Sequence, residues 1–234
     1  MIVFQNRNLI VPTGKEQWSG LLCWVVYLFL PFLLVGIPLF QENSLRSDFL
    51  FELTVTIVCY IVIMVAFRSF LFRSRIPFLS LLFTCFIGFV AAHALSSLWD
   101  ILLSSIRALF QEEHTNMNQE LVNEFLYNYK GFMILSVAFF TPVVEEVLFR
   151  GIIFAPICRR SPFAAYVISM FIFSAFHVIG FIGVQSWPML LLSCLEYLPA
   201  AFVLCWTYQR THSIWAPIAL HGFLNLYSSI LILS

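Results

Sequence analysis

Long apolar runs separated by short polar stretches restrict this chain to one class of fold. A helix needs about 20 apolar residues to cross a bilayer, and runs of about that length recur along the sequence. Only 10% of the residues are charged, whereas soluble domains carry about 25%. We predict an all-α, polytopic transmembrane helix bundle of about seven spans with a polar intramembrane cavity. The expected spans are residues 20–40, 49–67, 76–99, 130–158, 163–182, 188–208 and 214–233.

Residues 100–129 differ from the rest because they contain no 20-residue apolar run. Their acidic residues are Asp100, Glu112, Glu113, Glu120 and Glu124. We interpret them as an acidic extramembrane segment, with an interfacial helix as one alternative and an eighth, short span as the other. The chain divides here into residues 1–129, which hold N-terminal membrane helices and the acidic segment, and residues 130–234, a membrane core. Together they form one integral membrane domain.

Basic residues are unevenly distributed between the loops, and this bias predicts an orientation. Alternate loops hold most of them, namely Arg7, Lys15, Arg68, Arg73, Arg75, Arg159, Arg160 and Arg210. The N-terminus is therefore expected in the cytoplasm, with the acidic segment and the C-terminus outside. We expect an integral membrane protein of the bacterial inner membrane, because the chain is compact and lacks extra loops. The formal net charge of zero gives no indication of nucleic-acid binding, and the scattered cysteines show no metal-ligand spacing.

Three ionisable side chains lie close together inside the fourth expected span. They are Glu145, Glu146 and Arg150. Glu146 and Arg150 are four residues apart, so they share a helix face and can form an ion pair. Glu145 lies about 100° further round the helix and has no partner within the segment. A charge in hydrocarbon is costly, which predicts that these groups face the protein interior. A buried structural ion pair with an additional acid is the simpler alternative.

Polar residues in two later spans are expected at a similar depth. Glu145 lies about 14 residues from one end of the fourth span, and His177 lies about 14 residues from the same side of the fifth. His221 and Asn225 share one face of the seventh span. Straight helices would bring these groups into one intramembrane layer. Each alone also fits an ordinary interhelical hydrogen bond.

Such a layer suits two kinds of chemistry. Glu145 and His177 can act as acid and base on a water molecule, with His221 and Asn225 as donors to a developing oxyanion. Alternatively, Glu145, His177 and His221 can form a His₂Glu set with an open position, a known arrangement for catalytic zinc. The residues themselves leave both alternatives open, so the cofactor is either none or zinc.

Three short motifs in this part of the chain also resemble a known family. They are Glu145 and Glu146 with Arg150, then Phe173 with His177, then His221 with Asn225. This series is similar to that of the CPBP family, the CAAX prenyl-protease and bacteriocin-processing (Abi) intramembrane proteases. The resemblance covers residues 130–230. It implies an all-helical membrane core with a cavity. Glu146 and Arg150 would shape the site in this cavity.

The same resemblance implies roles for the remaining residues. Glu145 would activate the water with help from His177, while His221 and Asn225 would stabilise the oxyanion. The family has been described both as metalloproteases and as metal-independent glutamate proteases, so the metal question stays open. Glu196, inside the sixth span, is expected to line the cavity or to pair with Arg150.

We therefore expect an intramembrane endopeptidase that hydrolyses a peptide bond in a membrane-associated protein or peptide, of the CAAX type or in peptide processing. Its partners would be membrane lipid and a peptide or lipidated-protein substrate. One alternative is a non-catalytic membrane immunity or scaffold protein, although a scaffold has little need for the unpaired Glu145. Another is a small proton-coupled transporter, since intramembrane Glu and His also form proton relays. Carriers with inverted repeats tend to show paired broken helices in matching halves, and this sequence does not.

Overall fold

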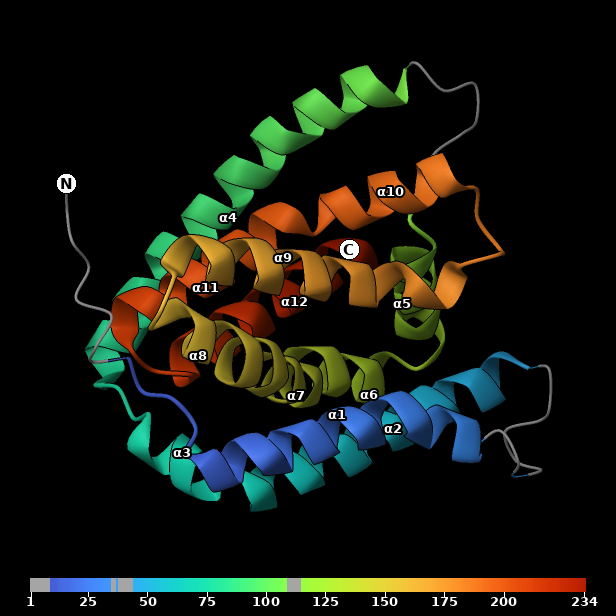
Figure 1. Cartoon of the computed structure of the whole chain (residues 1–234). Helices are drawn as coiled ribbons and strands as arrows, with labels where there is room; N and C mark the ends of the chain where they lie inside the picture. Colours follow the sequence, from blue (N-terminus) through green and yellow to red (C-terminus); the bar gives the residue numbers. More distant parts are fainter. Residues whose placement is uncertain (1–8, 35–36, 38–43, 109–114) are drawn as a thin grey trace.

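The protein is a bundle of helices (Figure 1). The structure, a computed structural model, describes residues 9–34, 37, 44–108 and 115–234. Within these ranges no β-strand forms. In chain order the elements are α1 (Gly14–Leu34), α2 (Leu45–Ala66), α3 (Arg68–Arg73), α4 (Phe78–Arg107), α5 (Met117–Asn128), α6 (Lys130–Leu135), the π-helix η3 (Ser136–Phe140), α7 (Thr141–Glu146), the π-helix η4 (Val147–Phe154), α8 (Ala155–Cys158), α9 (Pro162–Val178), the 3₁₀-helix η5 (Ile179–Phe181), α10 (Trp187–Glu196), α11 (Leu198–Thr211) and α12 (Trp215–Leu233).

Six helical runs among the described residues are long and apolar enough to cross a membrane. They are Leu45–Ala66, Phe78–Arg107, Lys130–Cys158, Pro162–Phe181, Trp187–Thr211 and Trp215–Leu233. The predicted all-α, polytopic bundle is confirmed, and the expected count of about seven is near the observed one. The remaining expected span, residues 20–40, falls partly on α1 and partly on residues outside the described ranges.

The run from α6 to α8 lies in the middle of the bundle. Figure 1 shows α1 and α2 side by side on one face of it, and both pack against its central part. On the other side it contacts α9 and α12, while α4 packs along α11 and α12. The central run is therefore the most enclosed of the six, as expected for a segment that carries charges through a membrane.

Helix α4 is longer than the expected third span of residues 76–99, because it continues to Arg107. A charge such as Asp100 ends an apolar run but does not end the backbone hydrogen bonding of a helix. Leu103, one turn further on, is fully buried against Met189 and Leu192 of α10 and stabilises this extension. Beyond it, α5 has 12 residues, too few for a span, which favours the interfacial-helix alternative. Glu112 and Glu113 lie outside the described residues.

The central run alternates between α- and π-helix, and its first π-helical turn, η3, comes just before Pro142, which has no N–H to donate. The N–H of Thr141 donates to Ser136, so the carbonyl of Val137 lacks a donor from both positions that would normally supply one. The side-chain amide of Asn225 in α12 donates to this carbonyl at 2.8 Å. In a membrane such a carbonyl has no water to bind, so the proline and the amide together dock α12 on the central run.

The same contact requires a glycine in α12. An ideal Cβ built on Gly222 would lie 2.3 Å from the backbone oxygen of Ala138, far inside van der Waals contact. The two helix backbones can approach this closely only because residue 222 has no side chain.

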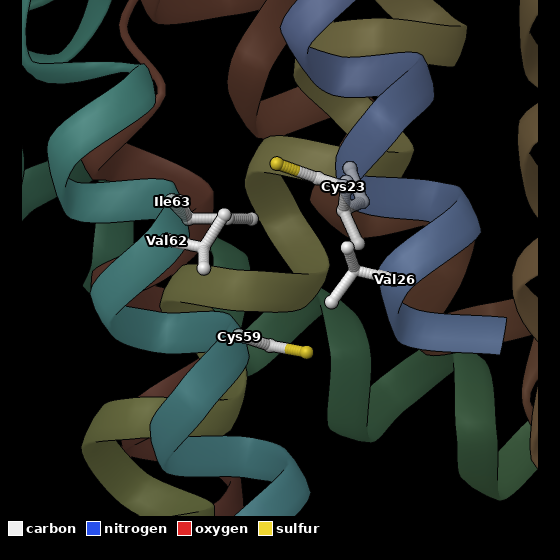
Figure 2. A pocket seen from close by; sticks show the side chains of 6 residues that line it. Cys23, Val26, Cys59, Val62 and Ile63 are labelled. Carbon is white, nitrogen blue, oxygen red and sulfur yellow. The ribbon is translucent and has the colours of Figure 1, made fainter. Parts of the chain in front are cut away.

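The cysteines pack as small apolar residues, and all six are free thiols. Two of them line a narrow pocket between α1, α2 and η4, shown in Figure 2. Its lining residues are Cys23, Val26, Cys59, Val62, Ile63 and Leu148, and its empty volume is about 170 Å³. The space is too narrow for a water molecule, so we interpret it as a packing gap rather than a binding site.

An N-terminal cap fixes the start of α1, before the first expected span. Thr13 and Glu16 form a capping box: the N–H of Thr13 donates to the Glu16 carboxylate at 2.7 Å, and the N–H of Glu16 donates to the Thr13 hydroxyl at 3.4 Å. Arg73 of α3 pairs with the same carboxylate at 2.7 Å. Burial would raise the pKa of Glu16, but the bonds from Arg73 and Thr13 outweigh it and hold the pKa below its ordinary value of 4.5.

We expect Gly222→Ala to destabilise the protein by about 1–3 kcal/mol, because the methyl group would press on a backbone oxygen that cannot move aside. Thermal unfolding midpoints in detergent measure the effect. Gly131→Ala is the matched control, since a Cβ at Gly131 meets nothing within 4 Å. Equal midpoints for the two variants would contradict the close packing of α12.

Arg73→Gln should lower the unfolding midpoint at neutral pH but not in strong acid. Because the folded-state pKa of Glu16 is depressed, the contribution of this contact is fully present above about pH 4.5 and is lost as the pH falls through the folded-state pKa. Midpoints of wild type and variant would be compared from about pH 7 to about pH 3. The exposed Arg160→Gln serves as the control. If the unfolding midpoints of wild type and Arg73→Gln differed by the same amount at about pH 3 as at about pH 7, the contact of Arg73 with ionised Glu16 would not be the cause.

Candidate active site

Three helical runs bring the motif residues together in the interior of the bundle. Glu145 and Glu146 form the end of α7, His177 lies in the last turn of α9, and His221 lies in the first half of α12. Both glutamates are buried, with exposed fractions of 6% for Glu145 and 0% for Glu146. The structure therefore places side chains from the fourth, fifth and seventh expected spans in a single cluster, as the depth estimate predicts.

Glu146 is the charged centre of this cluster. The Arg150 guanidinium donates to its Oε1 atom at 3.0 Å, so the expected ion pair is present, and His221 Nδ1 lies 2.8 Å from the same oxygen. Neither Glu146 nor Arg150 is exposed at all. A buried pair of this kind is tolerated only with additional polar partners, and the histidine supplies one of them.

Arg150 has two further contacts that hold its guanidinium in place. It donates to the backbone oxygen of Ala201 in α11 at 3.4 Å. Its Cζ atom lies 4.2 Å from the centre of the Phe173 ring, a cation–π contact with α9. The arginine therefore links η4 to α9 and α11 while it neutralises Glu146.

Glu145 has a different environment. Its Oε2 atom is buried and has no hydrogen-bond partner among the residues that the structure describes. His177 Nε2 and His221 Nε2 both lie 3.9 Å from this oxygen. That distance is too long for a direct hydrogen bond, but it suits groups that share a water molecule between them. The site thus presents one carboxylate oxygen to two imidazole nitrogens.

Hydrogen bonds at Nδ1 orient both imidazoles. His177 Nδ1 lies 2.8 Å from the backbone oxygen of Phe173, which can only accept, so this nitrogen carries the proton and leaves Nε2 as an acceptor. His221 Nδ1 faces the Glu146 carboxylate and is a donor for the same reason. Both rings consequently direct Nε2 toward Glu145.

The hydrogen bonding of Asn225 differs from what a role as oxyanion donor alone would predict. Its amide nitrogen donates to the Val137 carbonyl, so one of its two N–H groups has a structural use. The sequence-based prediction assumed straight helices, and it did not anticipate the carbonyl that Pro142 and the π-helical register leave without a donor. The second N–H has no hydrogen-bond partner among the described residues.

The donor set gives no support for a bound metal ion. Among the described residues, no group of three His, Cys, Asp or Glu side chains is arranged to hold one. In particular, each histidine Nε2 stands 3.9 Å from Glu145 Oε2, wider than the separation of about 3.3 Å that ligands bound at about 2.0 Å have in a tetrahedral zinc site. The expected His₂Glu arrangement does not fit this geometry, and we derive no step through a metal.

Two neighbouring residues contribute in ways that the sequence did not indicate. Glu196 pairs with Arg107 of α4 and accepts from Asn116 at 2.7 Å, whereas a pair with Arg150 was one expectation. Tyr197 packs its ring on the His177 imidazole with 4.4 Å between ring centres. The only sequence signal for this arrangement is Pro199, which marks a break in the sixth span.

Part of the chain matches a known protein family. Residues 128–227 match the family model described as Type II CAAX prenyl endopeptidase Rce1-like. The match confirms the family predicted from the motifs. All three motifs lie within the matched residues, and this match supports a CAAX-type intramembrane endopeptidase. No curated protein and no solved structure matches the chain significantly.

We expect Arg150→Met to destabilise the protein by about 3–5 kcal/mol, because it leaves the Glu146 carboxylate buried without its cation. Because methionine keeps most of the side-chain volume, the loss of stability measures mainly the effect of removing the positive charge. The unfolding midpoint in detergent measures it, with the exposed Arg160→Met as the control. If the double variant Glu146→Gln with Arg150→Met were no more stable than Arg150→Met alone, the uncompensated charge would not be the cause.

Proposed function

We propose that this protein is an intramembrane endopeptidase in which Glu145 activates a water molecule for attack on a peptide bond. The observation that carries the proposal is the buried, unpartnered Oε2 atom of Glu145, which lies 3.9 Å from both His177 Nε2 and His221 Nε2. A buried carboxylate oxygen without a partner is costly. A reacting water between Glu145 and the two imidazoles would complete the hydrogen bonding of this oxygen.

Glu145 and His177 would act on the water together. A water held between them donates one proton to the carboxylate and one to the imidazole, because His177 Nε2 is the free acceptor of its ring. Removal of a proton by Glu145 as general base makes the water nucleophilic when it attacks the substrate carbonyl. The protonated Glu145 then returns the proton to the leaving amine as the peptide bond breaks.

His221 and Asn225 would stabilise the oxyanion of the tetrahedral intermediate. His221 Nδ1 bonds to the Glu146 carboxylate, which holds the ring with Nε2 toward the site, and in the doubly protonated form of the ring Nε2–H would donate to the oxyanion. The second N–H of Asn225 supplies another donor. Arg150 and Glu146 would hold the histidine in place rather than touch the substrate.

The family match and the apolar surroundings favour a membrane-associated peptide or lipidated protein as the substrate, of the CAAX type or in peptide processing. The distribution of arginines supports a cytoplasmic N-terminus, and the compact chain supports the bacterial inner membrane. The donor geometry favours the glutamate type of mechanism over the metal-dependent one, and a chelator tests this preference directly.

We expect Glu145→Gln to reduce cleavage of an internally quenched, farnesylated CAAX peptide by at least about 100-fold, as for loss of a general base. The glutamine keeps the shape of the side chain, and an unchanged unfolding midpoint would show that the variant is folded. The exposed Glu124→Gln is the matched control. The non-prenylated peptide and a peptide library extend the assay to other substrates.

Two results would count against this proposal. Equal cleavage by wild type and Glu145→Gln would exclude Glu145 as the base. Loss of wild-type activity with a chelator, restored by added zinc, would replace the glutamate mechanism by a metal-dependent one.

A further inference from the structure

The sixth span is broken at the point where it passes the candidate site. Pro199 lacks an N–H, so the carbonyl of Leu195 four residues earlier loses its usual helical donor. The indole N–H of Trp99 in α4 donates to that carbonyl at 2.8 Å. The break separates α10 from α11 and leaves Tyr197 between them. An element outside the family-matched residues therefore stabilises this break.

Tyr197 lies against the imidazole of His177. The two ring centres are 4.4 Å apart and the ring planes are inclined by 31°, which is a close, tilted ring contact. Only 16% of the His177 side chain is exposed. The tyrosine ring thus covers part of an imidazole whose Nε2 faces Glu145.

The hydroxyl of Tyr197 is anchored to the segment that begins α5. Asn118 donates to it at 2.9 Å, and it donates to the side-chain oxygen of Asn116 at 3.2 Å. Asn116 in turn caps α5 and donates to Glu196 at 2.7 Å. Glu196 forms an ion pair with Arg107 at the end of α4. The orientation of the tyrosine ring is therefore set by α4 and α5 as well as by its own helix.

We infer that Tyr197 is a positioning residue that holds the His177 imidazole with Nε2 toward Glu145. The last torsion of a histidine side chain is broad and roughly two-fold, so the Nδ1 bond to the Phe173 oxygen has to hold the ring against rotation. The anchored tyrosine ring opposes that rotation by contact with the imidazole. The inference rests on the proposed function, because it assigns the orientation of His177 a part in activating the water.

Three variants separate the ring of Tyr197 from its hydroxyl. Tyr197→Leu removes the aromatic contact, Tyr197→Phe keeps the ring but loses its anchor, and Asn118→Ala removes one donor without altering the tyrosine. Tyr127→Leu is the matched control, because Tyr127 is 65% exposed and lies outside the site. Unfolding midpoints identify any variant that fails to fold; if Tyr197→Leu fails, the other two variants carry the test.

The first readout is cleavage of the quenched farnesylated peptide. We expect Tyr197→Leu to lower kcat by about 10- to 100-fold with little change in KM, because misplacing a reacting group by about 1 Å has an effect of this size. Tyr197→Phe and Asn118→Ala should lie between this variant and wild type. An unchanged kcat in Tyr197→Leu would overturn the inference about Tyr197. It would not affect the proposed role of Glu145, which the Glu145→Gln variant tests separately.

The second readout does not depend on activity. Nitrogen-15 NMR of histidine-labelled protein in micelles reports which ring nitrogen of His177 carries the proton, with His177→Gln to assign the signal. Wild type should show the Nδ1–H form, whereas Tyr197→Leu should show a mixture of both forms. An unchanged His177 signal in Tyr197→Leu would overturn the inference even if no tested peptide were cleaved.

Discussion

The fold depends on keeping one guanidinium and one carboxylate inside a membrane bundle without contact with solvent. Arg150 and Glu146 are completely buried, and an uncompensated charge there would cost several kcal/mol. The bundle compensates it with partners from separate helices: a backbone oxygen of α11, a ring of α9 and an imidazole of α12. Satisfying this one pair therefore brings together the helices that carry the candidate site. It also removes the partners that Glu145 would otherwise take, which leaves its carboxylate available.

Proline has a second organising effect. Each of two prolines leaves a carbonyl without its regular helical donor, and a side chain from another helix donates to that carbonyl. Asn225 does so near Pro142, and Trp99 does so near Pro199. Because lipid offers no alternative donor, these breaks become obligatory contacts between helices. Both lie beside the cluster of Glu145 and His177, so the irregular backbone is concentrated where the site is built.

The spans and the polar cluster were predictable from sequence because they follow from hydropathy and helical spacing. The Glu146–Arg150 ion pair follows from the four-residue separation of the two side chains. The common depth of Glu145 and His177 follows from their equal distances from the ends of their helices. The partner of Asn225 was not predictable, since it depends on the π-helical register after Ser136. The contact of Tyr197 with His177 depends on a tertiary break and on asparagines about 80 residues away. The extension of α4 to Arg107 depends on burial of Leu103, which no local pattern reveals.

The first described residues also have a consequence for how the protein is completed. Leu9 is fully buried, its carbonyl accepts from Arg159 at 2.7 Å, and the hydroxyl of Tyr208 donates to the carbonyl of Ile10. These partners are separated by about 150 and 198 residues in the chain. Leu9 and Ile10 thus depend on partners at the end of α8 and in α11, which are synthesised much later. Contacts of such long sequence separation form late in folding, so this end of the bundle closes only after α11 is in the membrane.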